Sequence, residues 1–168
     1  MKYFGMSMGM WAIFKGSFQK NLCSVFGYDK AAAKAIIKNA KPKYREIIDG
    51  IPEFEKGDRF KMNIVNCAML CAVIISMPQR PDRERLTEYY AKSMMTPAMR
   101  WFCRKSGKAK FTAKDIAAMK AAAKLKAADR NPYSWNMDFY EYPDKSGYEA
   151  RFSKCGICAL MQKLGLYD

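Results

Sequence analysis

The sequence predicts an α+β protein that is mostly helical, with about five helices packed with a C-terminal antiparallel β-hairpin and a short final helix. Apolar residues recur at three- and four-residue steps through most of the chain before Asn131, which indicates helices. Alternation with a period of two begins only after Asn131-Pro132. Half of the 168 residues are hydrophobic, so the chain can bury a core. We expect a single domain over 1–168, with a helical body at 1–130 and the hairpin and short helix at 131–168.

The first helix is expected at 6–20. Four apolar residues recur there at four-residue steps: Met6, Met10, Phe14 and Phe18. The same stretch resembles the apolar region of a short signal peptide, but Lys15 interrupts it and no small-residue cleavage site follows. We interpret it as a core-facing helix of a cytoplasmic protein.

The second helix is expected at 30–49, with two different faces. Basic residues at three- and four-residue steps mark a solvated face: Lys30, Lys34, Lys38, Lys41 and Arg45. Apolar residues mark the other face: Ile37, Ala40, Tyr44, Ile47 and Ile48. Pro42 is expected to kink or split this helix, because proline removes a backbone donor and crowds the preceding turn.

The third helix, expected at 58–77, is predicted to be the central and buried one. The run from Met62 to Met77 carries no charge, yet it is shorter than the about 20 apolar residues that a membrane span needs. Asp58 is placed to cap its start, and Pro78 is placed to end it. The protein is therefore expected to have no membrane partner.

Two more helices are expected, at 82–104 with a break before Pro97 and at 112–129. Thr112 and Asp115 resemble a capping box in which Asp replaces the usual Glu. Three residues are expected to face inward from the second of these helices: Ile116, Met119 and Ala123.

An antiparallel hairpin is expected from Ser134 to Ser153. Its first strand alternates, with one side made of Trp135, Met137 and Phe139 and the other of Asn136, Asp138 and Tyr140. The segment PDKSG has turn chemistry, and YEARFS returns as the second strand. CGICALMQKLG is then expected to form a short helix that ends at Gly165.

The net charge of +14 raises the possibility of nucleic-acid binding. Half of the excess lies between Arg104 and Arg130, where nine basic residues stand against two acids. The lysines, however, recur at helical spacing and are typical of solvated helix faces. No recognition motif accompanies them, and the aromatic residues do not alternate with them. Nucleic-acid binding is therefore the least favoured interpretation.

Six cysteines lie scattered through helix-like segments: Cys23, Cys67, Cys71, Cys103, Cys155 and Cys158. We interpret them as reduced thiols, because small disulfide scaffolds are shorter and rich in loops. The chain contains no histidine, so neither a zinc site nor a Cys-His pair is expected. The motif C-G-I-C leaves three interpretations open: a redox pair, a nucleophile with a neighbour, or packing. Cys155 at the helix start is expected to be the more reactive thiol, and Cys158 the more core-like one.

The C-terminal stretch NPYSWNMDFYEYPDKSGYEARFSKCGICALMQKLGLYD resembles the L-2-amino-thiazoline-4-carboxylic acid hydrolase family. Trp135 and Phe139 occupy the places of a W-x-x-x-F strand, and Phe152 and Cys155 those of an F-x-x-C strand that leads into a short helix. KMNIVNCAMLCAVIISMP and MTPAM are similar in layout to the helical part. Family members continue with a Cys-x-x-Asp segment and a further cysteine-bearing strand, whereas this sequence ends at Asp168. We expect a shortened or truncated chain, which would be inactive alone if the missing part supplied catalytic groups.

The resemblance implies a hydrolase that acts on a C–N bond of a cyclic amidine-like thiazoline and opens the ring to a carbamoyl-cysteine. Such a reaction needs a nucleophile, a proton donor and a cation for the substrate carboxylate. Cys155 is the candidate nucleophile and Asp138 the candidate proton shuttle. Lys154, Arg151 and Trp135 are the candidate substrate-binding residues. No cofactor is expected. The alternative is a non-catalytic small-molecule-binding or interaction module of the same fold.

Overall fold

The computed structural model describes residues 4–55, 58, 60–106, 112–128 and 131–167. The chain divides into two compact units. The first comprises Met1–Ile51 and Val65–Cys103, and the second comprises Pro52–Ile64 and Arg104–Asp168. The second unit thus takes a segment from the middle of the chain as well as its C-terminal part. The expected single domain over 1–168 stays a prediction.

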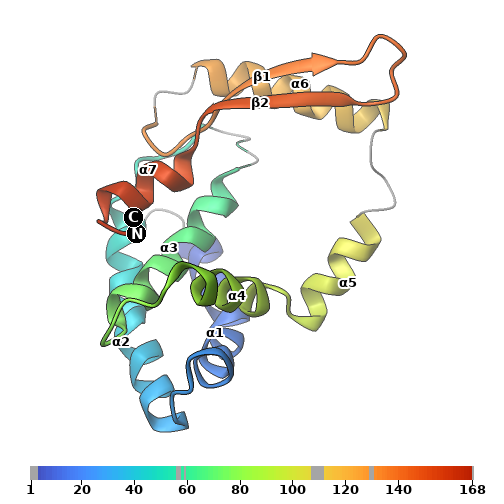
Figure 1. Ribbon diagram of the computed structural model, residues 1–168. Helices are drawn as coiled ribbons and strands as arrows, with labels where there is room; N and C mark the ends of the chain where they lie inside the picture. The colour runs from blue at the N-terminus through green and yellow to red at the C-terminus, as the bar shows by residue number, and fades with distance from the viewer. Residues whose placement is uncertain (1–3, 56–57, 59, 107–111, 129–130, 168) are drawn as a thin grey trace. The chain divides into compact units, whose positions relative to one another are not determined.

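The described elements confirm a mostly helical α+β fold with one C-terminal hairpin (Figure 1). The helices are α1 (Phe4–Phe26), α2 (Lys30–Asp49), α3 (Lys61–Ser76), α4 (Arg83–Met94), α5 (Pro97–Ser106), α6 (Ala113–Ala128) and α7 (Gly156–Lys163). The strands are β1 (Asn136–Glu141) and β2 (Tyr148–Lys154). The expected break before Pro97 is confirmed, because α4 ends at Met94 and α5 begins at Pro97.

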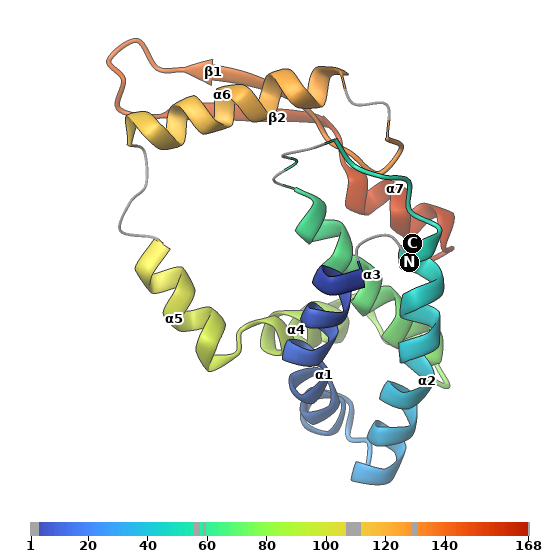
Figure 2. The same cartoon turned by 180° about the vertical axis from the view of Figure 1, so that it is seen from behind.

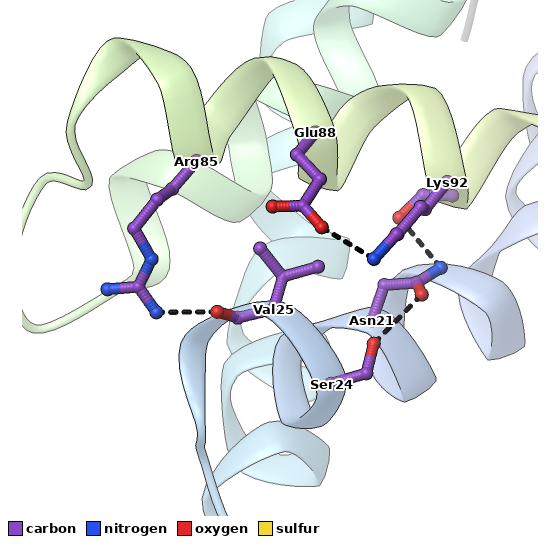
Figure 3. A network of polar contacts seen from close by, with 7 residues as sticks. Asn21, Ser24, Val25, Arg85, Glu88 and Lys92 are labelled. Carbon is purple, nitrogen blue, oxygen red and sulfur yellow. Dashed lines mark hydrogen bonds and ion pairs between the residues drawn. The ribbon is translucent and has the colours of Figure 1, made fainter.

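The first unit is held by contacts between α1 and α4 (Figure 3). Asn21 of α1 donates to the hydroxyl of Ser93 across 3.3 Å, and Arg85 of α4 donates to the carbonyl of Val25. Phe18 packs edge-on against Tyr89, with ring centroids 5.5 Å apart. Phe14 and Phe18 are fully buried, as the four-residue steps predicted. The side chain of Met6 lies outside the described residues.

Helix α2 shows the two faces that its sequence predicted. The five basic residues of the predicted solvated face are exposed, and Ile37, Ala40, Tyr44 and Ile48 are buried, whereas Ile47 is only half-buried. The Tyr44 ring stacks on Trp11 at 5.2 Å, and its hydroxyl donates to the carbonyl of Ser7 across 2.9 Å. The helix runs through Pro42 as one element, so Pro42 does not split it, and the alternative of a kink stays a prediction.

Helix α3 is the buried helix that its uncharged sequence predicted. Nearly every side chain from Ile64 to Ile74 is buried. The carboxylate of Asp58 accepts hydrogen bonds from the backbone N–H groups of Phe60 and Lys61, so the helix begins after a side-chain cap. Among the described residues, no helix combines the length and the apolar character that crossing a membrane requires.

The second unit contains the hairpin, α6 and α7. β1 and β2 pair antiparallel, with Asp138 opposite Arg151 and Asn136 opposite Lys154. The register shifts between Asn136 and Met137, which marks a β-bulge next to the start of α7. Helix α6 lies along the hairpin in both views (Figures 1 and 2) and contacts β1. The predicted alternation is confirmed, because Met137 is buried whereas Asn136, Asp138 and Tyr140 are exposed.

Candidate functional site

The strand-to-helix junction at C-G-I-C is built around a glycine. Cys155 is the N-cap of α7, and its backbone is extended (φ −112°, ψ 112°). A Cβ atom on Gly156 would lie 1.9 Å from the carbonyl oxygen of Tyr133 and 2.6 Å from its carbonyl carbon. Only a residue without a side chain allows this approach. The glycine between the cysteines therefore lets α7 begin directly against the chain that leads into β1.

Asn131 fixes the other side of this junction. Its buried side-chain amide donates to the carbonyls of Pro52 and Glu53, across 3.0 and 3.2 Å. Its side-chain oxygen accepts from the backbone N–H of Tyr133 across 2.9 Å. The sequence analysis treated Asn131 only as the end of the helical region. Only the structure shows that Asn131 is buried and links the carbonyls of residues 52–53 to the chain before β1 through hydrogen bonds.

Trp135 lies against the candidate nucleophile. The Trp135 side chain is buried, and its ring centroid is 5.4 Å from that of Phe60. Phe60 also makes an edge-on contact with the half-exposed ring of Phe152, at 6.0 Å. The indole N–H interacts with the sulfur of Cys155. The structure thus brings together two of the predicted site residues, Trp135 and Cys155.

The surroundings of Cys155 favour its thiolate. Burial raises the pKa of Cys155, but four donors oppose it, and the pKa ends below its ordinary value. The donors are the backbone N–H and thiol of Cys158, the backbone N–H of Ile157 and the indole N–H of Trp135. The sulfur makes no side-chain capping hydrogen bond, so these groups act on it as nearby dipoles.

Cys158 shows the opposite shift. Its interaction with the Cys155 sulfur raises the pKa of Cys158 above its ordinary value, and burial raises it further. Tyr167, two residues after Gly165, interacts with the Cys158 sulfur and opposes that rise. Both cysteines are half-buried rather than enclosed. Cys155 therefore loses its proton more readily, and Cys158 keeps its proton as the neighbouring thiol.

Lys154 and Arg151 have partners within the protein. The ammonium of Lys154 donates to the carbonyl of Asn131 across 2.8 Å. The guanidinium of Arg151 donates to Glu149 across 2.6 Å and lies 5.2 Å from the centroid of the Tyr140 ring. Lys154 thus ties the end of β2 to the residue that anchors the junction. Arg151 lies on the exposed side of the hairpin.

Asp138 stands further along the hairpin than the thiols. It is opposite Arg151 in the register, beyond the Asn136–Lys154 pair as seen from α7. Since a strand rises roughly 3.3 Å per residue, Asp138 lies about 10 Å along the chain from Trp135. It lines an open groove of about 830 Å³ between α6 and β1, with Lys120, Lys124 and Tyr140. Its role as a proton shuttle for Cys155 stays a prediction.

Three contributors to the site were not among the predicted site residues: Asn131, Gly156 and Tyr167. Gly156 could have been found in the sequence, because a glycine at the first position of a helix after a strand indicates close backbone approach. Tyr167 offered no such signal, since it lies beyond the turn that ends α7.

Comparisons with known proteins do not assign the chain to a family. No protein-family model matches the sequence, no curated protein matches it, and no solved structure matches the fold.

Proposed function

We propose that the protein is a cysteine-dependent hydrolase of the L-2-amino-thiazoline-4-carboxylic acid type, with Cys155 as the nucleophile. The observation that carries this proposal is the position of Cys155 as the N-cap of α7, next to the first backbone N–H groups of that helix, which favours the nucleophilic thiolate. The resemblance of the last forty or so residues to that hydrolase family supports the substrate class.

The reaction would pass through a covalent intermediate on Cys155. The thiolate adds to the C=N carbon of the ring, and the ring carbon–nitrogen bond then breaks as the ring nitrogen takes up protons and leaves as the free amine. Water attacks the resulting dithioimidocarbonate, the bond to Cys155 breaks as its thiolate leaves, and S-carbamoyl-cysteine is released. The net change is the addition of one water across the C–N bond that the resemblance implies.

The predicted binding residues contribute unequally to this proposal. Trp135 supports it directly, since its indole N–H interacts with the reacting sulfur. Arg151 is exposed and can receive a carboxylate in exchange for its bond to Glu149. Lys154 already donates to the carbonyl of Asn131, so its main role is to hold the junction. In this scheme a solvent molecule supplies the proton that was assigned to Asp138.

The test is turnover of the racemic thiazoline acid by the full chain, with carbamoyl-cysteine measured by mass spectrometry. We expect Cys155→Ala to abolish product formation. Cys103→Ser, which removes an exposed thiol from α5, should leave the rate unchanged. Asp138→Asn should also leave the rate within about twofold if solvent supplies the proton. Absence of turnover in the wild-type protein, or turnover that survives Cys155→Ala, would contradict the proposal.

The groove between α6 and β1 favours the second candidate, a non-catalytic small-molecule-binding module. Its walls are mainly apolar, and Lys120 and Lys124 provide positive charge for an acidic ligand. Calorimetric titration with the thiazoline acid separates the two candidates. Binding that is lost in Lys124→Ala but unchanged in Cys155→Ala, without turnover, would favour the binding module.

A further inference from the structure

Cys155 and Cys158 are spaced so that a disulfide bond can form between them. They lie three residues apart at the start of α7, where the N–H of Ala159 donates to the carbonyl of Cys155 across 3.1 Å. Helical geometry puts Cα atoms at this spacing about 5 Å apart. A disulfide needs Cα atoms roughly 4.4–6.8 Å apart, so closure needs only a small adjustment.

The surroundings of the two sulfurs divide their roles. Cys155 is the N-cap of α7, next to the first backbone N–H groups of the helix, and these groups and Trp135 lower the pKa of its thiol. Interaction with Cys155 raises the pKa of Cys158 instead. Both side chains are half-buried, so a small reagent can reach them. An attacking sulfur next to a second thiol that can displace its partner is the arrangement that thiol–disulfide exchange requires.

A second cysteine pair shows what this arrangement adds. The sulfurs of Cys67 and Cys71 lie 3.8 Å apart inside α3, but the two residues are 3% and 0% exposed. They lie within a helix rather than at its start, so the N–H groups around them are occupied in helical hydrogen bonds. Proximity of two sulfurs alone therefore does not make a redox site.

We propose that Cys155 and Cys158 form a dithiol–disulfide couple that exchanges with small organic disulfides such as glutathione disulfide, with Cys155 attacking and Cys158 resolving. This inference does not rest on the proposed hydrolase activity.

The exchange balances in two steps. The Cys155 thiolate attacks one sulfur of the small disulfide, which forms a mixed disulfide and releases one small thiolate that takes up a proton. Cys158 then loses its proton and attacks the Cys155 sulfur, and the second small thiol leaves. The dithiol is oxidised by two electrons to the Cys155–Cys158 disulfide, and one small disulfide is reduced to two thiols.

The test treats the reduced full chain with glutathione disulfide, stops the reaction with acid and identifies the modified peptides by mass. In the wild-type protein we expect a disulfide within the C-G-I-C peptide and only a trace of mixed disulfide. Cys158→Ser should accumulate one glutathione on Cys155. Cys155→Ser should react at Cys158 at least about tenfold more slowly, because exchange rates follow thiolate content.

The control variant is Cys103→Ser, in which the internal disulfide should form at the wild-type rate. Equal reaction of the two single variants would overturn the proposal. So would a wild-type protein that stays glutathionylated on Cys155 without closing the ring. Because no thiazoline is present, these outcomes are independent of hydrolase turnover, and Cys158→Ser keeps the nucleophile of the proposed hydrolase.

Trp135 is a positioning residue in this scheme, and Trp135→Phe tests it. The substitution keeps an aromatic ring next to Phe60 but removes the indole N–H. The pH profile of the exchange rate should shift to higher pH, and the rate at pH 7 should fall several-fold. The limiting rate at high pH should stay unchanged. A fall at every pH without a shift would mean that Trp135 acts only through packing, and the donor role would be wrong.

Discussion

The two cysteine pairs have similar spacing and very different environments. Cys67 and Cys71 lie in the buried middle of α3, in the first unit, whereas Cys155 and Cys158 lie at the start of α7, in the second. In α3 the thiols serve as small apolar side chains among other buried residues. At α7 they are half-buried, and Cys155 lies at the helix start, where the backbone N–H groups of Ile157 and Cys158 and the indole of Trp135 lower the pKa of its thiol. The position of a thiol along its helix thus decides its chemistry.

Thiol labelling should give the largest contrast between the two pairs. With iodoacetamide at neutral pH, we expect Cys155 to react first and Cys158 clearly later. Cys67 and Cys71 should react at least about 10³-fold more slowly than Cys155, because they must wait for the fold to open. Peptide mass spectrometry over time gives the four rates. If Cys67 or Cys71 reacted as fast as Cys158, the buried environment described for α3 would be wrong.

Gly156→Ala should disrupt the second pair specifically. Its Cβ would collide with the backbone of Tyr133, so the start of α7 must shift, at a cost of roughly 3 kcal/mol. Urea unfolding measures the free energy of unfolding, and labelling of Cys155 should also slow. The matched control is Gly16→Ala in α1, where no atom lies within 4 Å of the added Cβ. That change should stabilise the protein by about 0.5–1 kcal/mol.

A serine in each pair should separate packing from chemistry. Cys71→Ser places a hydroxyl at a fully buried position and should lower the free energy of unfolding by about 1–2 kcal/mol. Cys158→Ser changes a half-buried position and should cost less than about 0.5 kcal/mol. Equal losses in urea denaturation would show that both pairs serve packing alone.

Alkaline pH should weaken the region around the first pair. Burial, together with smaller contributions from charge on Cys67 and Cys71, raises the pKa of Tyr90 to about 12. The folded state therefore prefers neutral Tyr90, and this contribution is complete below the ordinary value of 10.0. It is lost as the pH rises from there through about 12. Urea midpoints across this range should fall less steeply in Tyr90→Phe, whereas the exposed Tyr142→Phe should follow the wild type.

The periodicity of the sequence was sufficient to predict which side chains are exposed where an element has one exposed face and one buried face. The lysine spacing of α2 predicted its exposed side, and the alternation from Trp135 to Tyr140 predicted the buried and exposed sides of β1. Helix ends were predicted where a side chain caps the backbone, as at Asp58 and Thr112. The end of α1 was missed, because the helix extends to Phe26, six residues past the expected end, and is closed by Gly27 in the left-handed conformation (φ 77°).

Local sequence determined the helices, the hairpin and the junction that puts Cys155 at the start of a helix, because propensity, capping and alternation act over a few residues. Tertiary structure decided which groups surround the sulfur. Trp135 reaches Cys155 because the bulged hairpin returns the chain to that point, and Asn131 holds the junction through carbonyls of residues 52–53. Asp138 lies on the same hairpin, but the strand register places it opposite Arg151, further along the strand from α7. Such proximities depend on the path of the whole chain, which residue spacing alone does not specify.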